Sequence, residues 1–156
     1  MRDIVIRGVR DADFDHWLVL WEGYNRFYER SVDEAVTRTT WQRFFNQEEP
    51  VYAHIAERDG RILGLVHYLF HRSTATIAPV CYLQDLFTNG QARGQGIGRA
   101  LIESVYAAAG ERGSPRVYWL THETNAQARL LYDDLAERSG FIQYRKQLPT
   151  GSDPRR

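Results

Sequence analysis

Glycines occupy alternate positions in a short run between a strand-like and a helix-like segment, Arg93-Gly94-Gln95-Gly96-Ile97-Gly98-Arg99. Such a loop exposes backbone N–H groups beside a helix N-terminus, where unpaired donors and the helix dipole favour a phosphate or pyrophosphate. The two flanking arginines can add charge-assisted hydrogen bonds to a ligand with several phosphates. The run therefore predicts an anion site. A tight turn that needs glycine for positive φ would use the same residues.

Two common phosphate loops do not match this run. The Walker A pattern ends in Gly-Lys-Ser/Thr, and nothing here supplies that ending. A dinucleotide fingerprint that starts at Gly94 requires Gly or Ala where Arg99 stands, and it normally follows the first strand of the domain. The sequence excludes a P-loop and disfavours a Rossmann site.

The elements before the run are expected from the spacing of apolar residues. Residues 4–7 are strand-like, and residues 11–13 can open a helix whose apolar positions recur every three or four residues. Ser31 and Glu34 have the spacing of a capping box, and residues 40–45 look like a further short helical piece. We expect this N-terminal section to be largely helical.

The rest of the chain alternates between strands and helices. Two strand-like runs are joined by Asp59-Gly60, a favoured hairpin dipeptide. Thr124 and Gln127 have the spacing of a second capping box. Strands are expected at residues 51–57, 61–70, 80–87, 116–121 and 141–145, with helices after Gly98 and from Thr124 to Gly140. This order predicts an α/β domain around one sheet.

Composition excludes several classes of protein. The chain has 156 residues, 43% hydrophobic and 26% charged, which suits one globular domain and disfavours disorder, collagen and coiled coil. Twenty basic and twenty acidic residues give no net charge, so the positive field that guides proteins to nucleic acid is missing. The single Cys81 excludes an intramolecular disulfide and a multi-cysteine zinc site, and we expect no metal. The N-terminus has no apolar block, so we expect neither signal peptide nor membrane span and a cytoplasmic location.

Several motifs together resemble the GNAT family of N-acetyltransferases. The run at residues 93–98 matches the family's Arg/Gln-x-x-Gly-x-Gly/Ala loop. The segment from Asn125 to Tyr132 resembles the Asn-x-x-Ala-x-x-x-Tyr segment of the family's fourth helix, and Gly140-Phe141 the pair before its final strand. The resemblance implies an N-acetyltransferase that uses acetyl-CoA as co-substrate.

The resemblance is specific over residues 80–146, whereas residues 1–79 match only in the order of their elements. It implies an α/β fold with a GNAT-like mixed, mostly antiparallel sheet flanked by helices. We expect one acetyltransferase domain over residues 1–148 and a flexible tail over residues 149–156. The ending of the domain resembles the fungal histone-acetyltransferase-like and D-amino-acid acetyltransferase group. Dimers are common among these relatives, so the resemblance also allows a homodimer.

The resemblance assigns roles to individual residues. In the family, loop amides bind the pyrophosphate of acetyl-CoA, the helix asparagine contacts the pantetheine arm and the helix tyrosine protonates the departing thiolate. Asn125 and Tyr132 hold these two positions, although a helix cap and core packing would also account for them. A backbone N–H on the fourth strand would stabilise the oxyanion. The implied acetyl-CoA residues are Leu86, Phe87, Arg93, Gly94, Gln95, Gly96, Ile97, Gly98, Arg99, Asn125 and Tyr132.

An amine acceptor must lose a proton before it attacks the thioester. An alkyl ammonium has a pKa of about 10.4, so only about one molecule in a few thousand is free amine near pH 7. Asp85 and Glu123 are candidate bases. As structural alternatives, Asp85 can be a strand-end carboxylate and Glu123 a charge near the start of a helix. His122 is a third candidate, since histidine titrates in the right range. This region is similar to diamine acetyltransferases, which carry Glu-Asp where this chain has Gln84-Asp85. Since Gln84 cannot take a proton, either Asp85 or a chain of water molecules removes the proton from the amine, or the acceptor differs from that of diamine acetyltransferases.

The acceptor should involve the N-terminal helices. Residues 11–49 hold nine Asp or Glu against four Arg, together with many aromatics. They can form an acidic, aromatic pocket for a cationic amine, or a core with a solvated acidic face. We expect a small cationic acceptor, polyamine or amino-acid-like, which attacks directly because Cys81 would pack as a small hydrophobe. The expected substrate-binding residues are Tyr24, Tyr28, Gln84 and Asp85.

Two alternatives to this enzyme remain open. One is a protein or histone lysine acetyltransferase, which the fungal resemblance supports and the zero net charge discourages. The other is a non-catalytic acyl-CoA-binding regulatory module, which would keep the glycine loop and could lose the acid and base. The presence of both Tyr132 and Asp85 favours the enzyme.

Overall fold

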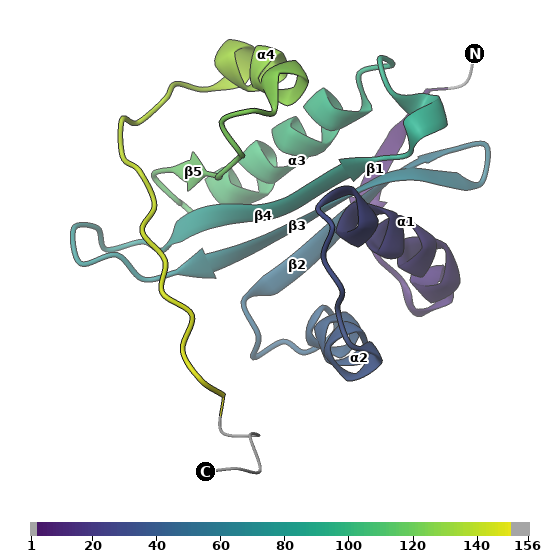
Figure 1. Cartoon of the computed structure of the whole chain (residues 1–156), viewed down its shortest axis with the longest axis horizontal. Helices are drawn as coiled ribbons and strands as arrows, with labels where there is room; N and C mark the ends of the chain where they lie inside the picture. The colour runs from purple at the N-terminus through teal and green to yellow at the C-terminus, as the bar shows by residue number, and fades with distance from the viewer. Residues whose placement is uncertain (1–2, 151–156) are drawn as a thin grey trace. The chain divides into compact units, whose positions relative to one another are not determined.

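Figure 1 shows a computed structural model of the chain, which describes residues 3–150. The chain forms two compact units, residues 1–122 with the whole sheet and residues 123–156 with the last helix. No helix within the described residues is long and apolar enough to cross a bilayer. The expected domain boundary after residue 148 stays a prediction, and residues 151–156 of the expected tail lie outside the described residues.

The first unit is built on a sheet whose strands follow one another in chain order. Neighbouring strands from the first to the fourth are antiparallel, and only the last pair is parallel. The strands are β1 (Val5–Gly8), β2 (Val51–Arg58), β3 (Arg61–His71), β4 (Val80–Thr88) and β5 (Val117–Tyr118). The predicted α/β fold with a mostly antiparallel sheet is confirmed.

Helices cover both faces of this sheet (Figure 1). Successive side chains of a strand point to opposite faces of the sheet, so two adjacent residues of β3 show which helix covers each face. Leu65 packs with the first helix, whereas a Cβ on Gly64 would lie 2.8 Å from Cγ2 of Ile97 on the third. The helices of the described chain are α1 (Phe14–Phe27), after a 3₁₀ turn at Asp11–Asp13, α2 (Glu34–Arg43), α3 (Ile97–Glu111) and α4 (Ala126–Leu135).

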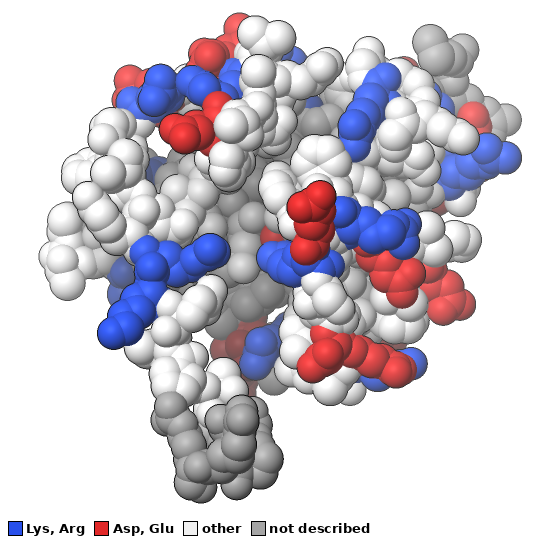
Figure 2. Space-filling view, in the orientation of Figure 1, with Lys and Arg blue, Asp and Glu red and all other residues white. Residues whose placement is uncertain are grey.

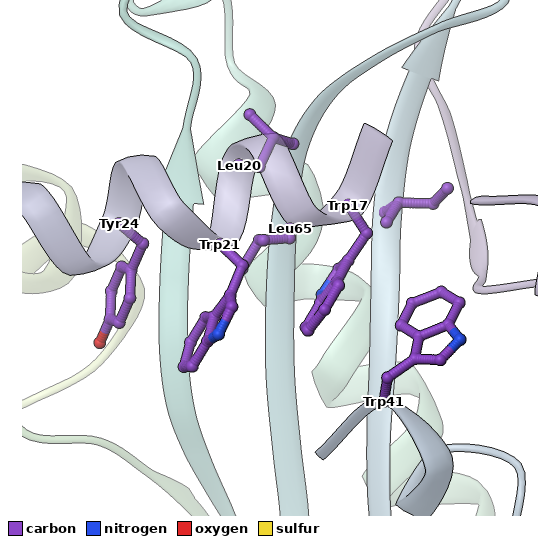
Figure 3. Close-up of a cluster of buried hydrophobic side chains, with 7 residues drawn as sticks. Trp17, Leu20, Trp21, Tyr24, Trp41 and Leu65 are labelled. Atoms are coloured by element: carbon purple, nitrogen blue, oxygen red, sulfur yellow. The ribbon is translucent and has the colours of Figure 1, made fainter. Parts of the chain in front are cut away.

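The core of the first unit lies between α1, α2 and the sheet (Figure 3). The spacing of three and four residues along α1 turns its large side chains to one face. The buried cluster contains Trp17, Leu20, Trp21, Tyr24, Trp41, Ile55 and Leu65. The aromatic residues of this cluster are buried, as their interpretation as core residues predicts.

The hairpin between β2 and β3 forms where the sequence predicts it. Asp59 and Gly60 have φ angles of 52° and 75°. Left-handed backbone at both central residues is what a two-residue type I′ turn requires. The hairpin pairs Arg58 with Arg61, and the register shifts by one residue between the pairs Glu57–Ile62 and Ala56–Gly64.

Both predicted capping boxes are wrong. Helix α2 begins at Glu34 with Asp33 in the cap position, and α4 begins at Ala126 with Asn125 in the cap position. Ser31 and Thr124 therefore do not hold the cap position that a capping box requires. Helix α2 also starts well before the short piece expected at residues 40–45.

The C-terminal prediction is also wrong. Helix α4 ends at Leu135, well before Gly140, and the expected strand at residues 141–145 is not paired to any strand of the described chain. Phe141 and Tyr144 are 91% and 89% exposed. Alternating apolar residues favour a strand only where a neighbouring backbone can accept its hydrogen bonds, and the described chain brings none to them.

Candidate active site

A bulge on β4 lies beside the predicted base. Asp85 pairs with His67 on β3, and the next pair is Leu83 with Tyr68, so Gln84 has no partner on that strand. Gln84 is exposed, whereas Asp85 is 6% exposed. A bulge re-aims the side chains around it. Here the amide side chain is at the surface and the carboxylate is directed into the α1 face.

A chain of hydrogen bonds fixes the Asp85 carboxylate from β3 and α1. His67 Nδ1 lies 2.9 Å from Asp85 Oδ2, and the indole Nε1–H of Trp17 donates to His67 Nε2 at 2.9 Å. An indole nitrogen can only donate, so Nε2 must be the acceptor. In this tautomer, His67 carries its hydrogen on Nδ1, and this N–H donates a hydrogen bond to Asp85. His67 positions the carboxylate and, in this arrangement, has no nitrogen left to accept a proton.

Tyr24 approaches the same carboxylate from α1. Burial and the nearby Asp85 carboxylate raise the pKa of Tyr24, so its hydroxyl stays protonated and can donate to that carboxylate. Its ring lies 5.0 Å from the ring of Tyr28, which is 43% exposed. On the other side it contacts the ring of Phe87 at 6.2 Å. The structure thus gathers three predicted residues, Tyr24, Tyr28 and Asp85, at the C-terminal end of α1.

The glycine loop has an open, left-handed backbone. Gly94 and Gly96 have φ angles of 78° and 81°, and a Cβ on either would meet no atom within 4 Å. Gly96 occupies the cap position of α3, no side chain caps this end, and no acidic residue stands in its first turn. The first N–H groups of α3 are therefore available to an anion. The requirement for positive φ is confirmed at these two glycines, and the anion site stays a prediction.

Two arginine contacts tie the loop to the rest of the unit. Arg58, at the end of β2, donates from Nη1 to Oε1 of Gln95 at 2.6 Å, and its Nε is buried without a hydrogen-bond partner. Arg93 places its guanidinium 5.5 Å from the ring of Phe27, at the end of α1. Arg58 thus adds a positive charge beside the loop, and this charge is suited to a phosphate group.

Strands β4 and β5 part beside the bulge. Their parallel pairing covers Cys81 with Val117 and Tyr82 with Tyr118, and it ends there within the described residues. Strand β4 continues to Thr88, so residues 83–88 present an edge without a β5 partner. An unpaired strand edge offers N–H and C=O groups to an extended ligand. Leu86 and Phe87, two predicted acetyl-CoA residues, lie on this edge.

Cys81 is fully buried on β4. Burial raises the pKa of its thiol to about 11, so the thiolate is scarce at neutral pH. The expectation that this cysteine packs as a small hydrophobe is confirmed.

The remaining predicted residues lie elsewhere. His122 is exposed at the end of the first unit. In the second unit, Glu123 is exposed and its carbonyl oxygen accepts a hydrogen bond from Arg129 at 2.8 Å. Asn125 holds the cap position of α4 without a side-chain cap hydrogen bond. Tyr132 is half-buried on a helix with no fully buried residue, which does not support core packing. The roles of Glu123, Asn125 and Tyr132 stay predictions.

Sequence reasoning missed three residues of this region. Trp17 lies in the segment predicted as a helix and His67 in one predicted as a strand, and their hydrogen bond joins positions 50 residues apart. Arg58 stands before the hairpin turn and contacts Gln95 across 37 residues. Local periodicity carries no signal for such pairs. The one sign of such a contact in the sequence is His67, a polar residue inside a strand of mostly apolar residues.

Comparisons with known proteins agree with this geometry. The model of the acetyltransferase (GNAT) family matches residues 17–136. The chain is 34% identical over 145 residues to the D-amino-acid N-acetyltransferase HPA3 of Saccharomyces cerevisiae, covering 92% of this chain and 90% of that protein.

Solved structures share the fold. A ribosomal-protein-alanine N-acetyltransferase from Brucella melitensis superposes with a TM-score of 0.78 at 18% identity, over 94% of this chain and all of that one. The structure of AAC(6')-Iy in complex with a bisubstrate analogue of CoA gives a TM-score of 0.78 at 20% identity, with the same coverage. The chain therefore belongs to the GNAT acetyltransferase family, as an N-acetyltransferase with acetyl-CoA as its co-substrate.

Proposed function

We propose that this N-acetyltransferase acetylates the amino group of a small, amino-acid-like acceptor. The observation that carries the proposal is the Asp85 carboxylate, which His67 holds on the α1 face of β4 beside Tyr24. The similarity to a D-amino-acid N-acetyltransferase over nearly the whole chain supports the acceptor class. A polyamine acceptor is less well supported, because Gln84 stands at the position where diamine acetyltransferases carry their glutamate.

The proposed reaction is a direct transfer. Asp85, through a carboxylate oxygen or one bridging water, takes a proton from the acceptor ammonium. The free amine nitrogen then forms a bond to the acetyl carbon, and the bond between that carbon and the CoA sulfur breaks. The departing thiolate takes a proton from the Tyr132 hydroxyl, and the second proton that the new amide nitrogen loses restores this hydroxyl. The buried, protonated state of Cys81 supports a route without a cysteine intermediate.

Acetyl-CoA is proposed to lie along the first N–H groups of α3 and the free edge of β4. The open backbone at Gly94 and Gly96 and the charge of Arg93 and Arg58 support a pyrophosphate there. A backbone N–H of residues 86–87 would receive the carbonyl oxygen as it gains negative charge. Asn125 would contact the pantetheine arm.

The acceptor is proposed to be a free small molecule rather than a nucleic acid or a histone tail. The chain has no net charge, and Figure 2 shows basic and acidic residues side by side over one face. Such a surface offers no extended field of one sign to a polymer. A cytoplasmic location and a homodimer remain proposals drawn from the family resemblance and the sequence.

An acceptor panel tests the proposal directly. Release of free CoA thiol is followed with D- and L-amino acids, spermidine and a basic histone-tail peptide as acceptors. We expect the highest kcat/KM with amino acids, and slower thiol release by Gly96→Asp at the same subsaturating acetyl-CoA concentration. Turnover confined to spermidine or to the peptide would contradict the proposed acceptor class.

A further inference from the structure

An open cavity of about 450 Å³ lies between α1, α2 and the loop that joins them. Apolar side chains line part of it, and charged side chains of α1, the loop and α2 line the rest. The apolar residues include Phe14, Leu18 and Trp21, and the charged ones are Glu22, Arg26, Arg30, Glu34 and Arg38. Neither the core nor the hydrogen-bonded chain around Asp85 accounts for this space. Its lining predicts a ligand with an apolar part and an anionic part.

Arg30 is the arginine of this cavity that hydrogen bonds to a buried amide hold in place. Its Nε and Nη2 donate to Oδ1 of Asn25 at 2.9 and 2.7 Å, and its backbone N–H donates to the carbonyl oxygen of the same residue at 2.8 Å. The guanidinium lies 5.6 Å from the ring of Trp21 and 5.4 Å from the ring of Tyr24. Asn25 is 6% exposed, so the anchor itself is rigid.

The charge of Arg30 is oriented but not neutralised. Its hydrogen-bond acceptor is a neutral amide, and no carboxylate pairs with it within the described residues. By contrast, Arg38 on the α2 side of the cavity is paired with Glu34 at 3.0 Å. A fixed guanidinium with unused donors is the arrangement that receives a carboxylate with two hydrogen bonds.

Tyr24 connects this cation to the proposed base. Its ring lies beside the Arg30 guanidinium, and its hydroxyl lies close to the Asp85 carboxylate. The amine and carboxylate of an α-amino acid are attached to one carbon. An amino acid placed along Tyr24 can therefore direct its ammonium toward Asp85 and its carboxylate toward Arg30.

We propose that Arg30 binds the carboxylate of the acceptor and selects amino acids with apolar side chains over polyamines. This inference rests on the proposed function and names the residue that sets its substrate class. A polyamine lacks a carboxylate and would bring its own positive charges toward the guanidinium, which like-charge repulsion disfavours. The apolar wall of the cavity would receive the side chain of the amino acid.

A matched pair of acceptors tests the inference. D-leucine and 3-methylbutylamine carry the same branched side chain and differ in the carboxylate. For the wild type we expect a KM at least about tenfold lower for D-leucine, since each tenfold corresponds to about 1.4 kcal/mol and a charge-assisted pair supplies at least that. Arg30→Gln should raise the KM for D-leucine by about tenfold or more and leave both its kcat and the KM for 3-methylbutylamine within about twofold.

Two further variants control for structure and charge. Arg30→Lys keeps the charge without the planar fork, so its KM for D-leucine should lie between those of the wild type and Arg30→Gln. Arg43→Gln removes a cation of α2 that does not line the cavity and whose contact with Glu49 is exposed, so both KM values should stay at the wild-type level. Acetyl-CoA affinity should be unchanged in all three variants.

The outcomes separate this inference from the proposed function. If D-leucine is acetylated and Arg30→Gln leaves its KM unchanged, or raises both KM values equally, the role of Arg30 is overturned and the proposed function stands. If the wild type acetylates 3-methylbutylamine and not D-leucine, both are overturned. A selective loss for D-leucine supports both.

Discussion

The α1 face of the sheet and the glycine loop before α3 are built in opposite ways. On the α1 face, buried side chains from three elements hold one another, as in the contacts of Trp17, His67 and Asp85. In the loop, exposed glycines leave open space, and the groups that point to a ligand belong to the backbone. Under the proposed function, side chains would select the acceptor and the main chain would hold the co-substrate.

The two regions are nonetheless joined through the sheet. Phe87 at the end of β4 lies beside Gly23 and Tyr24 of α1, and Gly64 of β3 lets α3 approach the opposite face. Arg93 of the loop reaches Phe27 at the end of α1. Substitutions can therefore be chosen that act on one region, on the other, or on the contact between them.

The largest effect is expected from Asp85→Asn, which keeps the shape of the side chain and removes the base. General acid–base groups typically contribute 10²- to 10⁴-fold, so the single-turnover rate with saturating amine should fall by about a hundredfold or more. Raising the pH should recover part of the loss, because more of the amine is then free. An unchanged rate with an unchanged pH profile would contradict the role of Asp85.

The next effect is expected from Gly96→Asp in the loop. A side chain at φ 81° strains the backbone by about 1–3 kcal/mol, and the carboxylate repels the phosphates. Acetyl-CoA affinity, measured by calorimetry, should fall at least about tenfold, and the strain should lower the unfolding midpoint by several degrees. Gly90→Asp brings the same charge to a neighbouring open glycine without positive φ and serves as the control. Equal affinities for both variants would place the anion site elsewhere.

The extent to which sequence predicts this molecule differs between the two regions. The loop, β4 and the hairpin at Asp59-Gly60 depend on adjacent residues, and their patterns predict them. The contacts of Trp17 with His67 and of Arg30 with Asn25 depend on how α1 crosses the sheet and how the following loop turns back. The segment at residues 141–145 has the pattern of a strand, but no strand of the described chain pairs with it. Strand pairing depends on residues far away in the sequence, so the local pattern does not reveal that a partner is missing.

A smaller effect is expected from Gly64→Ala, at the contact between the sheet and α3. The added Cβ would lie 2.8 Å from Ile97 and 3.1 Å from the carbonyl oxygen of Phe87. Overpacking of this kind typically costs about 1–3 kcal/mol, which chemical denaturation measures. Because Ile97 opens α3, acetyl-CoA affinity should weaken together with stability. A variant as stable as the wild type would show that α3 does not pack as closely as described.

The smallest effect on activity is expected from Cys81→Ala. The thiol is fully buried and, with a pKa raised to about 11, is not a nucleophile at neutral pH. Turnover should stay within about twofold of the wild type after correction for any loss of folded protein. Native protein should also react slowly with iodoacetamide and unfolded protein rapidly. Loss of turnover in a folded Cys81→Ala variant would argue for a covalent route.

The division between the two regions is tested most directly by titrating acetyl-CoA into wild type and Asp85→Asn in a calorimeter. If the α1 face acts on the acceptor alone, the two proteins bind acetyl-CoA with the same affinity, although Asp85→Asn has lost most of its turnover. An affinity for Asp85→Asn about tenfold weaker than that of the wild type would contradict this division, because the carboxylate would then be part of the co-substrate site.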